Sequence, residues 1–162
     1  MIDFPNSPTS GQVFTSGSLS WSWDGTKWAG KNNVTSPRYL VACSVPGVMT
    51  ASQHLLYLRL TKAITFPANW GAYLGHISEA GGGANATAST VINVDKATAA
   101  APNTFSNVGT ITIASSTVTP TFATSGGTTV SCAQGDVLRI VGPASADATF
   151  ADFYATLVGY ET

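Results

Sequence analysis

Hydrophobic and polar residues alternate in short runs along most of this chain, a pattern typical of half-buried β-strands. The clearest run is 18–23 (SLSWSW), in which Leu19, Trp21 and Trp23 share one face and three serines share the other. No window shows the spacing of apolar residues that indicates an amphipathic helix. The pattern therefore predicts an all-β protein.

A hairpin signal follows the first clear strand. Asp24 and Gly25 both tolerate the positive φ of a two-residue turn, so the chain is expected to return through 26–28. With a further strand over 12–15, the segment 11–29 is predicted to form a three-stranded antiparallel meander.

The remainder of the chain carries eight or nine short strands separated by glycine- and proline-rich turns. This spacing predicts an antiparallel β-sandwich of jelly-roll type, with the last strand in a central position. The expected strands are 39–44, 54–60, 63–66, 73–78, 90–95, 109–114, 118–124, 137–141 and 148–158.

Two parts of unequal size are expected. Prolines make 4–8 an extended arm, and 32–37 is predicted to be a linker. Residues 1–36 would therefore form a small module, and residues 37–162 would form the sandwich. The long loops 79–90 and 96–107 are solvated connections or, alternatively, recognition loops.

Composition excludes several classes of function. A net charge of −1 with only seven Lys and Arg residues cannot supply the clustered phosphate contacts of a nucleic-acid-binding protein. Apolar stretches fall short of the roughly 20 residues that span a membrane, and the first residues lack the pattern of a secretory signal. A hydrophobic content of 44% indicates a folded chain.

The sequence contains no clear motif of catalytic residues, and the protein is not expected to be an enzyme. The two histidines, His54 and His76, lie in predicted strands and no nucleophile motif accompanies them. Glycosidase chemistry needs a pair of carboxylates in a cleft, and no pair stands out. The acids outside turns and termini are Glu79, Asp95, Asp147 and Asp152.

Neither a metal nor a cofactor is expected. Asp147 and Asp152 could contribute to a calcium site, but the alternating acids of a calcium loop are missing, so capping of the next strand is the favoured interpretation. Cys43 and Cys132 have no metal or redox spacing and are interpreted as unpaired, buried residues.

Three of the four tryptophans lie in the predicted meander. Trp21, Trp23 and Trp28 could pack within the module or against a docking partner, which is the favoured interpretation. They could also form an aromatic platform for a sugar.

Two parts of the sequence resemble proteins of tailed bacteriophages. The segments 2–8 (IDFPNSP), 11–15 (GQVFT) and 21–28 (WSWDGTKW) are similar to a module near the N-termini of phage and prophage structural proteins, including fibres. Later segments are similar to C-terminal domains of phage tail and fibre proteins. They are 64–69, 75–76, 88–91, 109–112, 135–138 and 147–149.

The resemblance implies a non-enzymatic structural protein on the virion surface. Its module would dock on a major capsid or tail protein, and the sandwich would project outward as part of a homotrimer. No coiled coil or repetitive shaft is present, which favours a short capsid-bound fibre or decoration protein. The alternative is a tail fibre that binds a host-surface glycan. The expected docking residues are Phe4, Pro5, Trp21, Trp23 and Trp28.

Overall fold

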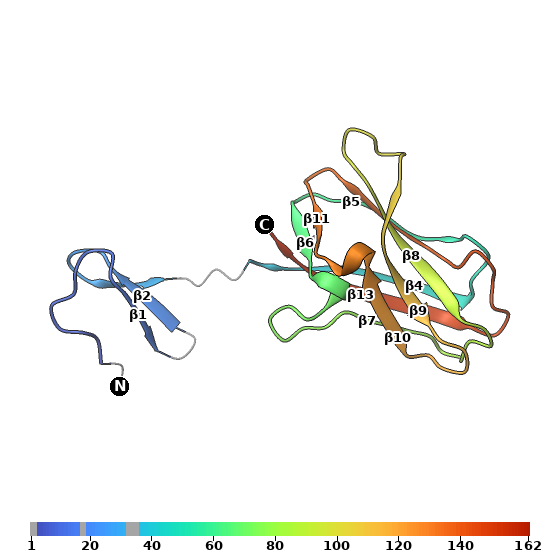
Figure 1. The fold of residues 1–162 in the computed structure, drawn as a ribbon, viewed down its shortest axis with the longest axis horizontal. Helices are drawn as coiled ribbons and strands as arrows, with labels where there is room; N and C mark the ends of the chain where they lie inside the picture. The colour runs from blue at the N-terminus through green and yellow to red at the C-terminus, as the bar shows by residue number, and fades with distance from the viewer. Residues whose placement is uncertain (1–2, 17–18, 32–35) are drawn as a thin grey trace. The chain divides into compact units, whose positions relative to one another are not determined.

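The computed structural model describes residues 3–16, 19–31 and 36–162, and nearly all of their regular structure is β-strand. The chain divides into two compact units, Met1–Thr35 and Ser36–Thr162, one residue from the boundary expected from the sequence (Figure 1). Residues 32–35 of the predicted linker lie outside the described part of the chain.

The first unit is an antiparallel sheet in the order β1-β2-β3, so the predicted meander is confirmed. Its strands are β1 (Val13–Ser16), β2 (Leu19–Trp23) and β3 (Trp28–Lys31). The predicted two-residue turn is wrong, because Trp23 pairs directly with Trp28 and four residues connect them. Asp24 stabilises this longer turn: its Oδ1 accepts hydrogen bonds from the backbone N–H groups of Thr26 and Lys27, each at 2.9 Å.

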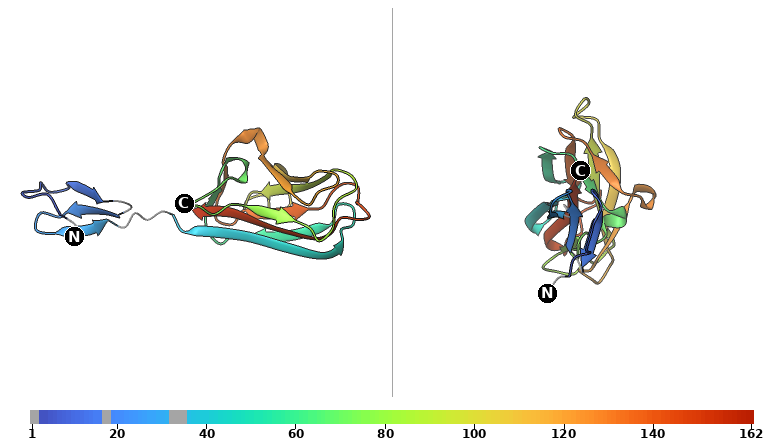
Figure 2. Two further views of the ribbon diagram at one scale, coloured as in Figure 1. Left: turned by 90° about the horizontal axis from the view of Figure 1, so that it is seen from below. Right: turned by 90° about the vertical axis from the view of Figure 1, so that its left-hand side faces the viewer.

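The second unit has two antiparallel sheets, which confirms the predicted sandwich (Figure 2). One sheet has the order β10-β9-β8-β12-β5; the other has the order β11-β6-β13-β4, with β7 also paired to β13. The strands are β4 (Arg38–Val48), β5 (His54–Arg59), β6 (Ile64–Phe66), β7 (Glu79–Gly81), β8 (Thr90–Ala97), β9 (Ser106–Ile113), β10 (Pro120–Thr124), β11 (Val130–Cys132), β12 (Val137–Val141) and β13 (Ala151–Glu161), with short 3-10 turns η1 (Ala68–Trp70) and η2 (Ser125–Gly127).

The chain crosses between the sheets repeatedly, from β4 to β5, β5 to β6 and β7 to β8, and again at each connection from β10 to β13. Such crossing is the feature of a jelly roll that the sequence predicted. As expected, β13 is central, because β4 pairs along one side of it and β6 and β7 along the other.

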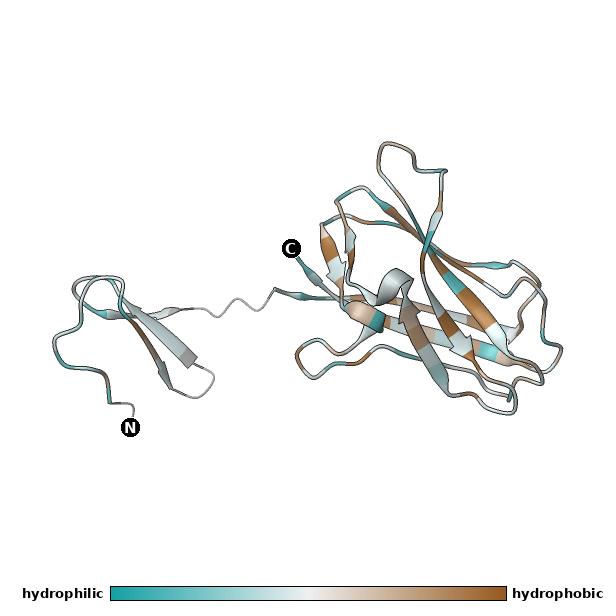
Figure 3. Ribbon diagram, viewed as in Figure 1, coloured by the Kyte–Doolittle hydropathy of each residue, from teal (hydrophilic) through white to brown (hydrophobic). Residues whose placement is uncertain are grey.

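The core lies between the two sheets and is built from the apolar positions that alternate along their strands (Figure 3). Burial of each large side chain stabilises the fold by roughly 1.5–3 kcal/mol. One sheet contributes Val41, Val45, Ile64, Phe66, Phe153, Ala155 and Leu157; the other contributes Ile92, Val94, Ile111, Ile113, Leu138 and Ile140.

The predicted strand 73–78 is wrong. The backbones of Tyr73 and His76 hydrogen bond to each other at 2.8 and 3.0 Å, closing a tight turn. Leu74 and Gly75 have φ of 52° and 78°, values that break an extended strand. Ser78, which ends this segment, accepts a hydrogen bond at its Oγ from the backbone N–H of Val158 at 3.0 Å.

The loop expected at 79–90 is also partly wrong, because it begins with β7. The glycines of this segment serve close packing: a Cβ at Gly81 would lie 2.8 Å from Tyr154 Oη, and one at Gly82 would lie 2.5 Å from Phe150 Cε2. The short strand β11 was not predicted.

Candidate functional site: the aromatic face of the N-terminal sheet

One face of the N-terminal sheet is aromatic. Phe14 pairs across the strands with Trp21, and Trp23 pairs with Trp28. Because side chains of a strand alternate between faces, these four side chains share one side of the sheet. Phe14 lies 5.9 Å from Trp21, and Trp23 lies 5.5 Å from Trp28, measured between ring centroids.

The opposite face of the same sheet is polar. Thr15 and Ser20 pair across the strands, and their hydroxyls are hydrogen bonded at 3.1 Å. Ser22 shares this face, because it lies two residues beyond Ser20. Ser20 and Ser22 therefore lie on the face opposite the tryptophans, as predicted. Ser18 and the side chain of Leu19, for which predictions were also made, lie outside the described part of the chain.

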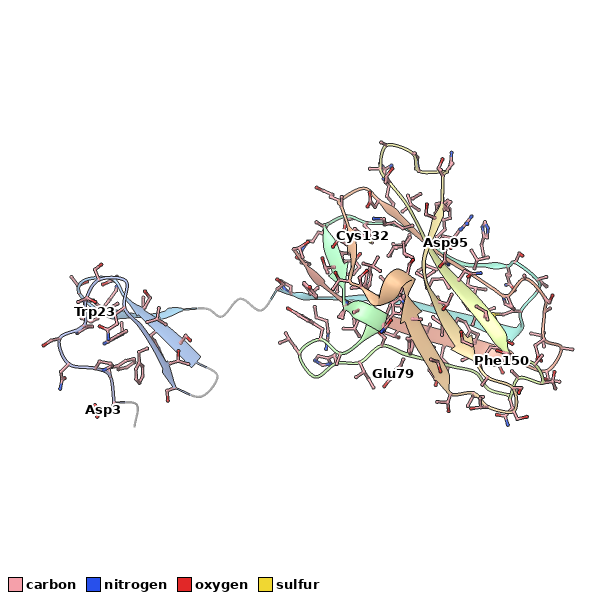
Figure 4. All side chains as sticks on the ribbon, in the orientation of Figure 1. Asp3, Trp23, Glu79, Asp95, Cys132 and Phe150 are labelled. Carbon is pink, nitrogen blue, oxygen red and sulfur yellow. The ribbon has the colours of Figure 1, made fainter. Side chains whose placement is uncertain are left out.

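The N-terminal arm folds back over the aromatic face. The ring of Phe4 lies 5.2 Å from Phe14, 5.2 Å from Trp21 and 5.4 Å from Trp28, and it stacks on Trp28 with an interplanar angle of 17°. Phe4 therefore occupies the middle of the cluster, and Pro5 beside it is half-buried. Figure 4 labels Trp23, whose indole lies at the edge of this cluster.

Backbone hydrogen bonds fix the arm to the sheet. Gly11 donates its N–H to the carbonyl of Trp23 at 2.8 Å, and Trp23 donates to the carbonyl of Gln12 at 2.9 Å. The Gln12 side chain in turn accepts the N–H of Thr9 at 3.0 Å. These contacts hold the arm in the position from which Phe4 reaches the tryptophans.

The structure therefore brings together four of the five residues expected to dock, with Pro5 adjacent to them in the chain. Phe14 is an additional member that the sequence analysis missed, although its place opposite Trp21 follows from the strand register. All of these aromatic rings are half-buried, which leaves part of each accessible. Aromatic side chains that combine packing with an accessible edge are typical of protein-binding surfaces.

The candidate catalytic residues are scattered. His54 begins β5, His76 lies in the turn before β7, and both are exposed. Asp95 is paired with Arg139, whose Nη2 lies 2.7 Å from its carboxylate. Within residues 3–16, 19–31 and 36–162, no three or more His, Cys, Asp and Glu side chains gather where they could hold a metal ion.

Asp147 organises the loops ahead of two strands. Its Oδ2 accepts hydrogen bonds from the backbone N–H groups of Thr87 and Ala88 at 2.8 and 2.7 Å. Its Oδ1 accepts those of Thr149 and Phe150 at 2.9 and 3.0 Å. These bonds, that from Ala88 above all, hold the pKa of Asp147 well below its usual range.

Asp152 does not bind the same loops as Asp147. Its Oδ1 accepts a hydrogen bond from the backbone N–H of Gly47 at 2.7 Å. The two aspartates considered for calcium thus serve separate loops. For Asp147, the capping interpretation is confirmed, since it binds the N–H groups directly before β13.

Both cysteines are free, as predicted, and Cys132 is buried, whereas Cys43 is only half-buried. Burial raises the pKa of each thiol, Cys43 and Cys132, to about 11. A thiol with such a pKa is protonated at neutral pH and is a poor nucleophile.

The loop between β8 and β9, expected at 96–107, folds against its own sheet. Phe105 lies under the guanidinium of Arg139 at 4.0 Å and meets the ring of Tyr57 at 5.7 Å. Asn107 donates hydrogen bonds to the side chains of Asn93 and Asp95, each at 3.2 Å. The result is a polar surface beside a tyrosine that is 54% exposed.

No protein-family model, curated protein or solved structure matches this chain. The described part of the chain contains no helix long and apolar enough to cross a membrane. The aromatic face and its arm are the feature of the molecule that best supports a functional proposal.

Proposed function

We propose that this protein is a structural protein of a tailed bacteriophage, a short capsid-bound fibre or decoration protein. It attaches to the particle through residues 1–36, and a homotrimer displays the sandwich at the virion surface. Its partner on the particle is the major capsid protein or, in a tail location, a tail protein. It acts without a cofactor and catalyses no reaction.

The observation that supports attachment most directly is the aromatic face of the N-terminal sheet. This sheet belongs to a compact unit that is separate from the sandwich. Among the described residues Phe4 covers the aromatic face of this three-stranded sheet, and the rings of Phe14, Trp21, Trp23 and Trp28 remain partly exposed. A partner that covers them removes a large apolar area from water. Tryptophans in such positions are frequent centres of binding energy.

The second unit suits display. Two sheets around a continuous core form a rigid body, and the surface is rich in hydroxyls because only 9% of all residues are charged. The similarity of both parts to phage proteins, described from the sequence, supports the same assignment.

Particle binding tests the proposal. Purified protein is added to particles that lack it, and bound protein is measured after sedimentation. Trp23→Ala is the informative variant, because Trp23 lies at the cluster edge and its loss leaves the contacts of Phe4 intact. Ser22→Ala, on the opposite face, is the matched control.

We expect Trp23→Ala to weaken particle binding about tenfold or more, as for a tryptophan that a partner covers, and Ser22→Ala to leave it unchanged. A chain without residues 1–36 should not bind at all. Binding by that truncated chain at the level of the whole protein would overturn the proposal.

A tail fibre that binds a host glycan is the second candidate. It is favoured by the exposed Tyr57 beside Arg139 and the amides of Asn93 and Asn107, a combination that can stack on and hydrogen bond to a sugar. Binding to host cells that Tyr57→Ala abolishes would support this role. Absence of binding to host cells and to a glycan array would exclude it.

A further inference from the structure

A surface that combines exposed hydrophobic side chains with charged ones covers the outside of the sheet that contains β13. It consists of Arg38 and Leu40 on β4, Tyr154, Thr156 and Val158 on β13, Glu79 on β7, and Ile77 before it; we call it the β4–β13 face. Leu40 is 48% exposed, Ile77 60% and Tyr154 49%, so three large hydrophobic side chains meet water on one side of the sheet. Large hydrophobic side chains that stay exposed on one side of a sheet are a feature of interaction surfaces.

The β4–β13 face is hollowed. A depression of about 300 Å³ is lined by residues of β4 on one side and by residues 75–79 on the other. Thr156 and Val158 of the central strand form its floor, because Val158 pairs with Leu40 and Thr156 pairs with Glu79. An occupant of this depression would contact the polar side chains of Arg38, His76, Glu79 and Thr156 as well as the aliphatic carbon of Leu40 and Ile77.

The two sides of the depression carry opposite charges. Arg38 lies on the β4 side and Glu79, labelled in Figure 4, lies on the β7 side. The ion pairs formed among the described residues are Lys62–Glu161, Lys96–Asp136 and Arg139–Asp95, so Arg38 and Glu79 are unpaired. One surface thus presents both a free cation and a free anion.

The strand beside this face is a free edge. β4 is the last strand of its sheet and is 11 residues long, and among the described strands its one partner is β13. Between Tyr39 and Val45 it contains no charged residue and no proline that would discourage pairing with another chain. Long apolar edge strands are sites at which proteins associate.

We infer that the β4–β13 face packs against a second copy of this chain. A copy is the fitting occupant because the two sides of the face complement each other: the Arg38 side of one copy meets the Glu79 side of the next in head-to-tail order, as a closed trimer requires. Leu40 of one copy and Ile77 of the next are then buried at the contact. The inference deepens the proposed homotrimer and rests on it, since it names the surface through which the copies meet.

The oligomeric state of the full chain tests this inference. Mass measured by light scattering and by native mass spectrometry should show an oligomer at micromolar concentration. The double variant Leu40→Asp with Ile77→Asp should be a monomer, because each contact between neighbouring copies would bury two new carboxylates. Val91→Asp is the control, since Val91 is also exposed, at 40%, but lies on the other sheet.

A monomeric wild-type chain overturns the inference, as does an oligomer that survives the double variant. Circular dichroism and thermal unfolding check that the variant is folded. If it is not, a charge exchange replaces it: Arg38→Glu or Glu79→Arg alone should weaken association about tenfold, the effect of losing one interfacial ion pair of roughly 1.4 kcal/mol. The two together should restore it, and a failure of restoration would count against the inference.

These outcomes are separate from those of the proposed function. A monomeric double variant whose module still binds particles supports both proposals. An oligomer that never binds particles supports the self-association and contradicts the attachment role.

Discussion

The indole of Trp70 lies directly on the backbone of Gly109, so that a Cβ at position 109 would come within 2.8 Å of two indole atoms. Trp70 follows β6 of one sheet, whereas Gly109 belongs to β9 of the other. The indole N–H also donates a hydrogen bond to the carbonyl of Ala123 at 3.1 Å, and the ring packs against Phe66 at 5.2 Å. This tryptophan therefore joins the two sheets through a contact that only glycine allows.

Gly109→Ala should destabilise the sandwich by about 1–3 kcal/mol, the usual cost of overpacking a core. The added Cβ would also lie 2.5 Å from the carbonyl oxygen of Ala123, which cannot move without disturbing β10. Gly142→Ala is the control, because a Cβ there meets its neighbours at an ordinary 3.5 Å. Urea unfolding measures both, and equal stability of the two variants would contradict the packing described.

Asp147 should make the stability of the sandwich sensitive to acid. Its pKa is lowered in the folded protein, so its contribution is complete above the pKa of the unfolded chain, about 3.9, and is lost as the pH falls toward the folded value. Asp147→Asn should lower the melting temperature at neutral pH and flatten its decline below pH about 4. Asp3→Asn, in the exposed arm, serves as the control. A melting curve that depends on acid equally in wild type and Asp147→Asn would contradict this role.

The two thiols should react slowly in the folded protein. With a pKa of about 11 for Cys43 and for Cys132, the thiolate fraction at pH 8 is about 100-fold smaller than for a cysteine with an ordinary pKa near 8.5–9. Reaction with a disulfide reagent, followed by absorbance, should therefore accelerate strongly when denaturant is added. Comparison with Cys43→Ser separates the reaction rates of the two thiols. Fast reaction of both thiols in the native state would be inconsistent with their burial.

Loss of Phe4 should loosen the N-terminal unit alone. Phe4→Ala removes the contacts with Phe14, Trp21 and Trp28, which are worth about 1–2 kcal/mol for a half-buried ring. Tryptophan emission should shift to longer wavelength, because three of the four tryptophans lie in this unit. The melting temperature of the sandwich should stay the same; a matching decrease would show that the units do not unfold independently.

Alternation along the chain predicted the strands that have one face in the core and one face outside. The strand 137–141 has the predicted bounds, and the meander has the predicted order. The strand predicted at 73–78 failed because Leu74 and Gly75 adopt positive φ, which a run of apolar residues does not reveal. β7 (EAG) and β11 (VSC) were missed because each has three residues and lacks the run of β-branched and aromatic residues that marked the equally short β6 (ITF).

The sequence predicted that the tryptophans of the candidate site lie together in one sheet. It did not predict that the N-terminal arm folds back over them. The prolines near Phe4 indicate local extension and say nothing of the long-range contacts that return Phe4 to Trp21 and Trp28. The β4–β13 face was equally hidden, because Leu40, Ile77 and Tyr154 come from segments that meet only in the folded sheet.

Cryo-electron microscopy of the phage particle that encodes this chain tests the central claim most directly. Attachment through the N-terminal unit predicts density of the size of the sandwich at regular positions on the capsid, joined to the shell by the Trp21–Trp28 hairpin. Density confined to the tail would favour the glycan-binding fibre instead. Particles with no copy of the chain on head or tail would contradict the assignment as a virion protein.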